Sequence, residues 1–167
     1  MENRNPHYDF NCSLINIAGD FYGAYQRCIE GKNPRVDEWG RHVADVVNVP
    51  VIVNGAFAME LYLKYLSPLS AKELKEKKHS LRALFLTLEE KDQANIKKQV
   101  EKGSFFPFTF EERLKVINKS FTFWRYIHEK PDLGPGLNVT LNVLHSFLEA
   151  IRKCALDKEE KDKSNSQ

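Results

Sequence analysis

The stretch Val53-Asn-Gly-Ala-Phe-Ala-Met-Glu-Leu-Tyr-Leu-Lys-Tyr-Leu66 decides the fold class of this chain of 167 residues. Val53, Phe57 and Leu61 recur every four residues and therefore share one face of a helix. The other faces are also apolar, through Ile52, Ala56, Met59 and Leu63. A helix that is apolar on nearly all sides is typical of the centre of a bundle. The β-branched run 49–53 also resembles a strand, but no partner strand of comparable quality occurs elsewhere, so we predict a helix.

Helical spacing of apolar residues continues on both sides of this stretch. Further helices are predicted over 14–28, from near Asp37 to Pro50, over 81–88, over 89–101, from Thr109 and from about Asn138. Thr109 and Glu112 form the pattern of a capping box, and Pro50 is expected to kink or interrupt its helix. The sequence thus predicts an all-α fold, an antiparallel bundle of five to six helices.

Composition predicts one domain and a tail. The chain is 42% hydrophobic and 29% charged, which is ordinary for a globular protein. Residues 1–156 are expected to form a single bundle domain. Residues 157–167 contain only charged and small polar side chains, so we predict a disordered tail there.

Charge, cysteines and motifs narrow the functional classes. A formal charge of +2 is too small to indicate nucleic-acid binding by itself. Three cysteines without CxxC spacing, and an N-terminus without an apolar signal region, predict reduced thiols in the cytoplasm. The apolar stretch 49–66 is interrupted by polar residues and is a poor membrane span. The common nucleotide, zinc and hydrolase motifs are absent, so no cofactor and no metal are predicted.

Glu60 and Lys64 form the first constellation with functional potential. They are four residues apart on a helix that is otherwise apolar, so they share a face. A charge inside a bundle must be paired or hydrogen-bonded. One interpretation is a structural ion pair, with Lys64 reaching solvent. The other places Glu60 at the wall of a polar groove.

The second constellation is Trp124-Arg-Tyr-Ile-His-Glu129, in which Arg125, His128 and Glu129 share a helix face. Arginine can bind phosphate, and histidine can transfer a proton near neutral pH. The structural alternative is that Arg125 pairs with Glu60 or Glu129 inside the bundle and that His128 caps the helix end.

His79 is the third constellation. It follows the charged run 72–78 and opens a predicted helix. Histidine at this position can be a cap or a packing residue, and the charged run can be a solvated loop or part of a phosphate-attracting surface.

These segments together resemble a HEPN domain (higher eukaryotes and prokaryotes nucleotide-binding). The matching pieces are Ala56-Phe-Ala-Met-Glu-Leu-Tyr-Leu-Lys64, His79-Ser-Leu-Arg-Ala-Leu-Phe85 and Phe123-Trp-Arg-Tyr-Ile-His-Glu129, followed by an apolar last helix. They are similar to the family's A-x-E-x-x-L-K helix, its H-D-L-x-x-L helix and a late helix with an Arg-Tyr pair. The resemblance covers about residues 40–155 and implies an antiparallel bundle, frequently a homodimer.

Many HEPN proteins are metal-independent RNases of toxin–antitoxin or phage-defence systems, in which an Arg is followed after four to six residues by a His. Here only two residues separate Arg125 from His128, and Ser80 stands where family members often have Asp. Arg35 and His42 have the permitted spacing but precede the matched helix, so we regard that pair as chance.

Three hypotheses follow from the resemblance. The first is a non-catalytic domain that binds RNA, a nucleotide or an antitoxin-like partner protein in a prokaryotic cytoplasm. The second is a divergent RNase in which Arg125 and His128 are catalytic. The third is a structural or interaction protein. The ligand-binding residues predicted under the first hypothesis are Glu60, Lys64, His79, Tyr126 and Glu129.

Overall fold

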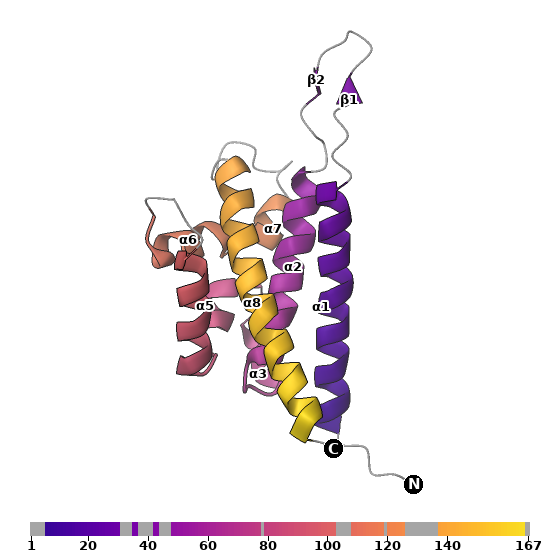
Figure 1. Cartoon of the computed structure of the whole chain (residues 1–167), viewed down its shortest axis with the longest axis vertical. Coiled ribbons are helices and arrows are strands. Elements are labelled where there is room, and N and C mark those ends of the chain that lie inside the picture. The colour runs from indigo at the N-terminus through magenta and orange to yellow at the C-terminus, as the bar shows by residue number, and fades with distance from the viewer. Residues whose placement is uncertain are drawn as a thin grey trace.

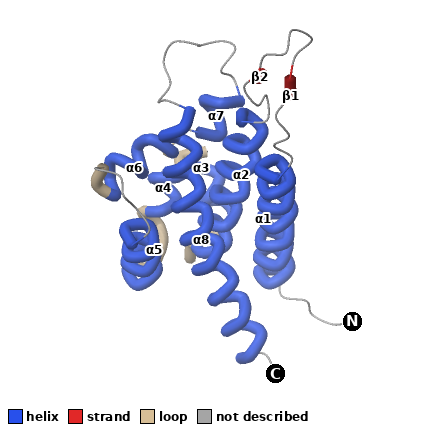
Figure 2. Tube along the Cα trace, turned by 45° about the horizontal axis from the view of Figure 1, so that its top comes forward, coloured by secondary structure: helices blue, strands red, loops and turns tan. Residues whose placement is uncertain are grey.

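The structure is a computed structural model that describes residues 6–30, 35–36, 42–43, 48–77, 79–102, 108–118, 120–125 and 137–165. Its helices are α1 (Pro6–Glu30), α2 (Asn48–Leu66), α3 (Ala71–Glu76), α4 (Leu81–Phe85), α5 (Glu90–Lys102), α6 (Phe110–Ile117), α7 (Ser120–Arg125) and α8 (Leu137–Asn165). Two short strands, β1 (Arg35–Val36) and β2 (His42–Val43), pair in antiparallel register. The predicted all-helical bundle is confirmed, and nearly all of the described chain is helical (Figure 2).

Helix α2 is the centre of the bundle. It packs against α1, α8, α7 and α4, while α5 and α6 pack against α8 from the other side. In Figure 1, α1 runs upward from the N-terminal end, whereas α2 and α8 both run downward. The antiparallel α1–α2 pair is therefore joined by a third long helix that runs parallel to α2.

The start of α2 corrects one sequence prediction. A helix from near Asp37 to Pro50 is wrong at His42–Val43, which form β2 instead. Asp37 itself lies outside the described residues. Helix α2 begins at Asn48, so Pro50 lies in its first turn. A proline there neither kinks nor interrupts the helix, because the first amide groups of a helix have no intrahelical acceptor.

Close packing of α1, α2 and α8 depends on Gly55. A methyl group at this position would lie 2.7 Å from Cδ2 of Leu144 and 2.9 Å from Cδ2 of Tyr25. Both neighbours are buried core residues. The glycine lets the three helices approach at a point where an alanine has no room.

The helix that was predicted to run on from Thr109 is divided. The capping box of Thr109 and Glu112 is present at the start of α6, and its hydrogen bonds lower the pKa of Glu112. The helix ends at Ile117, and α7 begins at Ser120. Next to this break, Asn118 accepts hydrogen bonds from the Ser80 hydroxyl and the Arg82 amide. The break thus lies where the chain contacts the start of α4.

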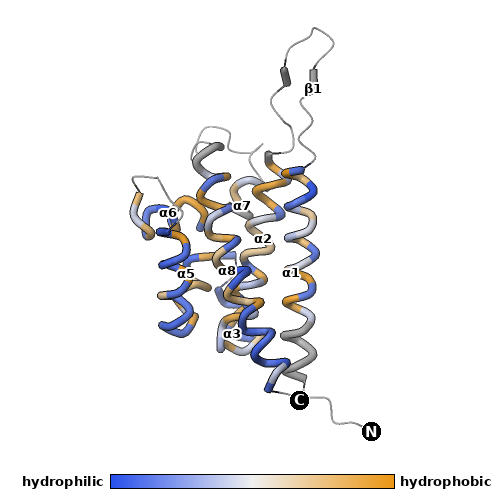
Figure 3. The backbone as a smooth tube through the Cα atoms, viewed as in Figure 1, coloured by the Kyte–Doolittle hydropathy of each residue, from blue (hydrophilic) through white to orange (hydrophobic). Residues whose placement is uncertain are grey.

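The predicted disordered tail is also corrected. Residues 157–165 continue α8 as a helix. Lys158 anchors this part, because its ammonium donates to the Tyr65 carbonyl over 3.3 Å and lies 5.2 Å from the centre of the Tyr65 ring. Lys163 and Glu159 form an ion pair of 2.6 Å one turn apart. Such pairs support an exposed helix whose residues are mostly hydrophilic (Figure 3).

No helix in the described part of the chain combines the length and the apolar character that a membrane span requires.

Candidate functional site

The candidate site is centred on Glu60, in the middle of α2. This charged side chain has no exposed surface and lies among the apolar residues of the core. A carboxylate in such a place is strongly destabilising unless charged or hydrogen-bonding partners reach it. Two side chains do so, one on each oxygen.

The first partner, Lys64, is one turn further along α2. Its ammonium donates to Oε1 of Glu60 over 2.6 Å, and the side chain is 21% exposed. The i, i+4 spacing places the two residues on the same face, and the long lysine stem carries the ammonium from the core toward solvent. The predicted ion pair between Glu60 and Lys64 is therefore confirmed.

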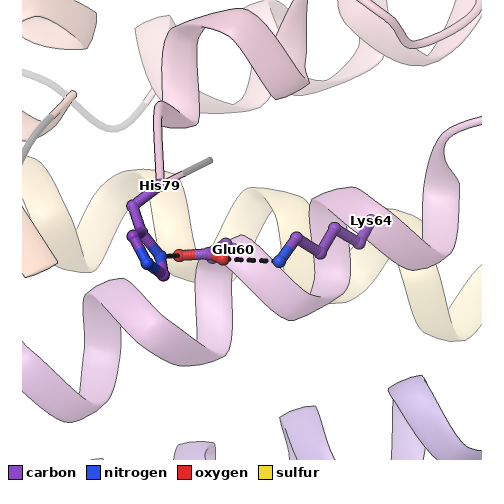
Figure 4. Close-up of polar contacts among 3 residues, drawn as sticks. All are labelled: Glu60, Lys64 and His79. Atoms are coloured by element: carbon purple, nitrogen blue, oxygen red, sulfur yellow. Dashed lines mark hydrogen bonds and ion pairs between the residues drawn. The ribbon is translucent and has the colours of Figure 1, made fainter. Parts of the chain in front are cut away.

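The second partner, His79, comes from the segment before α4. Its Nδ1 lies 2.9 Å from Oε2 of Glu60, and the side chain is 48% exposed. Figure 4 shows the imidazole on one side of the carboxylate and Lys64 on the other. One buried carboxylate thus fixes two partly exposed nitrogen groups from two different elements.

The cap of α4 is Ser80, whereas His79 was one of the residues considered for this role. The Ser80 hydroxyl accepts from the amide of Ala83 and donates to Oδ1 of Asn118. Aspartate and serine are both good N-cap residues. Ser80 can therefore perform, at the start of this helix, the capping role that an aspartate would have there.

Arg125 is the last residue of α7, and α7 packs against α2. The side chain of Arg125, and all of Tyr126, His128 and Glu129, lie outside the described residues. The predicted contact of Arg125 with Glu60 or Glu129, and the cap formed by His128, consequently stay predictions. Among the described side chains of α7, Trp124 is buried in the core.

A second polar cluster, on α8, was not predicted. His145, Glu149 and Arg152 lie at i, i+4 and i+7, so they share one face of the helix. The Tyr25 hydroxyl is 2.7 Å from Nδ1 of His145, and the Tyr22 hydroxyl donates to Oε1 of Glu149 over 2.9 Å. Both tyrosines come from α1, so this cluster joins α1 to α8.

Arg152 extends the cluster to α2. Its guanidinium lies 4.2 Å from the centre of the Tyr22 ring, and it is near the Tyr62 side chain of α2. Burial raises the pKa of Tyr62, while the charge of Arg152 acts in the opposite direction. Burial likewise raises the pKa of Tyr25 far above its ordinary value, so its hydroxyl keeps its proton at neutral pH.

A sequence signal for this cluster exists. The polar residues follow directly after members of the apolar stripe of the last helix, as Leu144-His145, Leu148-Glu149 and Ile151-Arg152. Such a polar row beside the apolar stripe lies at the edge of the buried face, where a charged side chain can contact both a neighbouring helix and solvent. No role was predicted for this row, because none of the three constellations found in the sequence includes it.

Among the described side chains, no group of three or more His, Cys, Asp or Glu residues is arranged to hold a metal ion.

The fold and the site define an all-helical bundle with a buried carboxylate that holds a lysine and a histidine. Comparison with family models, with curated proteins and with solved structures found no match to the chain. The resemblance to HEPN domains therefore depends on the residues of this sequence and on their arrangement.

Proposed function

We propose that this chain is a HEPN-like helical domain that binds RNA through its phosphate groups, without cleaving it, in a prokaryotic stress or defence system. The observation that carries the proposal is the contact of Glu60 with both Lys64 and His79. These residues belong to two of the three segments on which the resemblance depends. The third segment includes α7, which also packs against α2.

The Glu60 contacts favour binding of an anion by Lys64 and His79, and not binding of a ligand by the Glu60 carboxylate itself. Glu60 is fully buried, so a ligand does not reach it. Lys64 and His79 are partly exposed and are fixed in position by it. Two nitrogen groups held in this way are suited to bind phosphate oxygens, because their side chains are already ordered before the ligand arrives.

The elements that flank His79 in the sequence carry exposed cations, and α3 carries Glu73 and Glu76 as well. Lys72 and Lys75 on α3 and Arg82 on α4 are exposed. Lys72 and Lys75 are three residues apart and share a face of α3. Exposed cations beside a fixed lysine and histidine support contact with several phosphates of a strand rather than with one.

The spacing between Arg125 and His128 supports binding without cleavage, because it is shorter than in the RNases of the family. The proposal also includes a homodimer, which the resemblance implies, and a cytoplasmic location, which the cysteines and the N-terminus predict. Sedimentation of the pure protein would measure that state, and a monomer at all concentrations would remove the dimer from the proposal.

Anisotropy of a fluorescent single-stranded RNA, measured over a range of salt concentrations, tests the proposal. The variant Lys72→Gln, Lys75→Gln is compared with Lys98→Gln, Lys102→Gln, which removes the same charge from exposed positions of α5. We expect the first variant to bind more weakly. The slope of log K against log salt should decrease in magnitude by about 1.4, because each of the two lost phosphate contacts contributes about 0.7. Equal behaviour of the two variants would exclude this surface.

The same preparation distinguishes the other functions. Cleavage of RNA without metal by the parent protein, and none by the Arg125→Ala, His128→Ala variant, would replace the proposal with an RNase. Absence of RNA binding at low salt would overturn it and leave a nucleotide ligand, a partner protein or a structural role as the alternatives.

A further inference from the structure

The outer face of α8 carries a groove that the proposed RNA surface does not include. Its volume is about 570 Å³, and Gln99 of α5 contributes to one wall. Small-molecule sites in proteins commonly have about 300–1,000 Å³. The groove also differs in position from the candidate site, because it follows α8 whereas Glu60, Lys64 and His79 belong to α2 and the segment before α4.

Charges of both signs line this groove in a definite order along the helix. Glu149 comes first, Arg152 and Lys153 follow one turn later, and Asp157 and Glu160 come one and two turns after these. With 1.5 Å of rise per residue, successive residues of this row are about 4.5–6 Å apart along the helix axis. The sequence of charges is therefore negative, positive and negative along one open face.

The first two of these charges are fixed from behind. The Tyr22 hydroxyl donates to Glu149, and the Tyr22 ring lies 4.2 Å from the guanidinium of Arg152. A charged side chain on an ordinary solvated helix face is not held in this way. Ordered charges lose less conformational entropy when a ligand binds, which is how binding sites are organised in general.

We propose that this groove binds a free amino acid with a cationic side chain, such as lysine or arginine. The carboxylate of the ligand would bind Arg152 and Lys153, and its α-ammonium group would bind Glu149. Its side-chain cation would reach Asp157, which lies about 12 Å of helix rise from Glu149. The apolar wall formed by Leu156 lies between these ends and would contact the aliphatic stem.

The net charge of the groove favours this class of ligand over anions. Glu149, Asp157 and Glu160 outnumber Arg152 and Lys153, so the lining has a formal charge of −1 when His145 is neutral. A basic amino acid has a net charge of +1, which complements it. A nucleic-acid strand or a phosphate ester would be repelled by the acidic end.

The test is a titration of the ¹⁵N-labelled full chain, followed by NMR, with L-lysine as the probe. Three relatives of lysine each lack one group: Nα-acetyl-lysine lacks the α-ammonium, lysinamide lacks the carboxylate, and norleucine lacks the side-chain cation. We expect lysine to shift amide signals of residues 145–160 at millimolar concentration, and each relative to bind about two- to fivefold more weakly, as for an exposed ion pair.

Variants connect the effect to the groove. Lys153→Gln is expected to weaken lysine binding but to leave lysinamide binding unchanged, and Asp157→Asn is expected to remove the difference between lysine and norleucine. Lys98→Gln, on an exposed position of α5, is the control and should bind as the parent does. No shift with lysine, or equal binding of lysine and its three relatives, would overturn the proposal. Neither outcome depends on RNA binding.

Discussion

Gly55 offers the sharpest test of how the three long helices pack. Replacement by alanine adds a methyl group that would lie 2.7 Å from Leu144 and 2.9 Å from the ring of Tyr25. Real Cβ atoms do not approach other atoms so closely, so one neighbour has to move. Tyr25 is nearly fully buried and its hydroxyl is 2.7 Å from His145, so its ring has little freedom to do so.

Two effects of opposite sign set the magnitude. Alanine is favoured over glycine in a helix by about 0.8–1.0 kcal/mol. An extra methyl group in a packed core costs about 1–3 kcal/mol. The matched control is Gly19→Ala on α1, where an added Cβ meets no atom within 4 Å. Because both variants gain the same helix propensity, the difference between them isolates the steric cost.

We expect Gly19→Ala to raise the free energy of unfolding by up to about 1 kcal/mol, and Gly55→Ala to lie about 1–3 kcal/mol below it. Urea denaturation followed by circular dichroism measures both values. Thermal unfolding should agree, with about 2–4 °C for each kcal/mol in a chain of this size. If Gly55→Ala is as stable as Gly19→Ala, the close approach of α1, α2 and α8 at Gly55 is wrong.

Three further predictions concern single side chains. Glu60→Gln should lower the free energy of unfolding by about 1–3 kcal/mol, because Lys64 and His79 lose a buried charged partner but retain access to solvent. Denaturation of Glu60→Gln, of His79→Gln and of the double variant measures the coupling between the two residues, and no loss of stability in Glu60→Gln would contradict the prediction. The cap hydrogen bonds lower the pKa of Glu112 in the folded state, so their stabilisation is present above the ordinary value of 4.5 and is lost as the pH falls through the folded pKa. Glu112→Gln should therefore flatten the decline of stability below about pH 4.5, and an unchanged acid decline would refute this. Burial raises the pKa of the Cys154 thiol to about 11, so at pH 8 it should react with iodoacetamide about a hundredfold more slowly in the native protein than in urea, as mass spectrometry of the labelled peptides would show; equal rates would contradict its burial.

The long helices were predictable because their sequence signals are strong and local. The apolar character of α2, the stripe of α1 and the capping box of Thr109 each depend on neighbouring residues, and all three are present in the structure. The start of α2 was not placed correctly, because Pro50 is compatible both with a kink inside a helix and with a first turn. The pairing of β1 with β2 shows that no helix runs through 42–43, so Pro50 lies in a first turn and not at a kink.

The candidate site was predictable in part for the same reason. Glu60 and Lys64 are neighbours on one helix, so their ion pair followed from spacing alone. The contact with His79 joins residues 19 positions apart in the sequence and depends on how α4 is placed. The tyrosine contacts of His145 and Glu149 span more than a hundred residues, and no local pattern reports which helices will face each other.

The order of the helices along the chain determines when the core can form in a cell. The apolar surface of α2 is covered on one side by α8, yet about 70 residues separate the end of α2 from the start of α8. At about 5–20 residues per second, a ribosome needs roughly 5–20 s to synthesise this segment and α8 itself. During that interval the nascent chain exposes α2 with only α1 and the intermediate helices to cover it. A chain that stops before residue 137 would keep this surface exposed permanently, and we expect such a fragment to aggregate rather than fold.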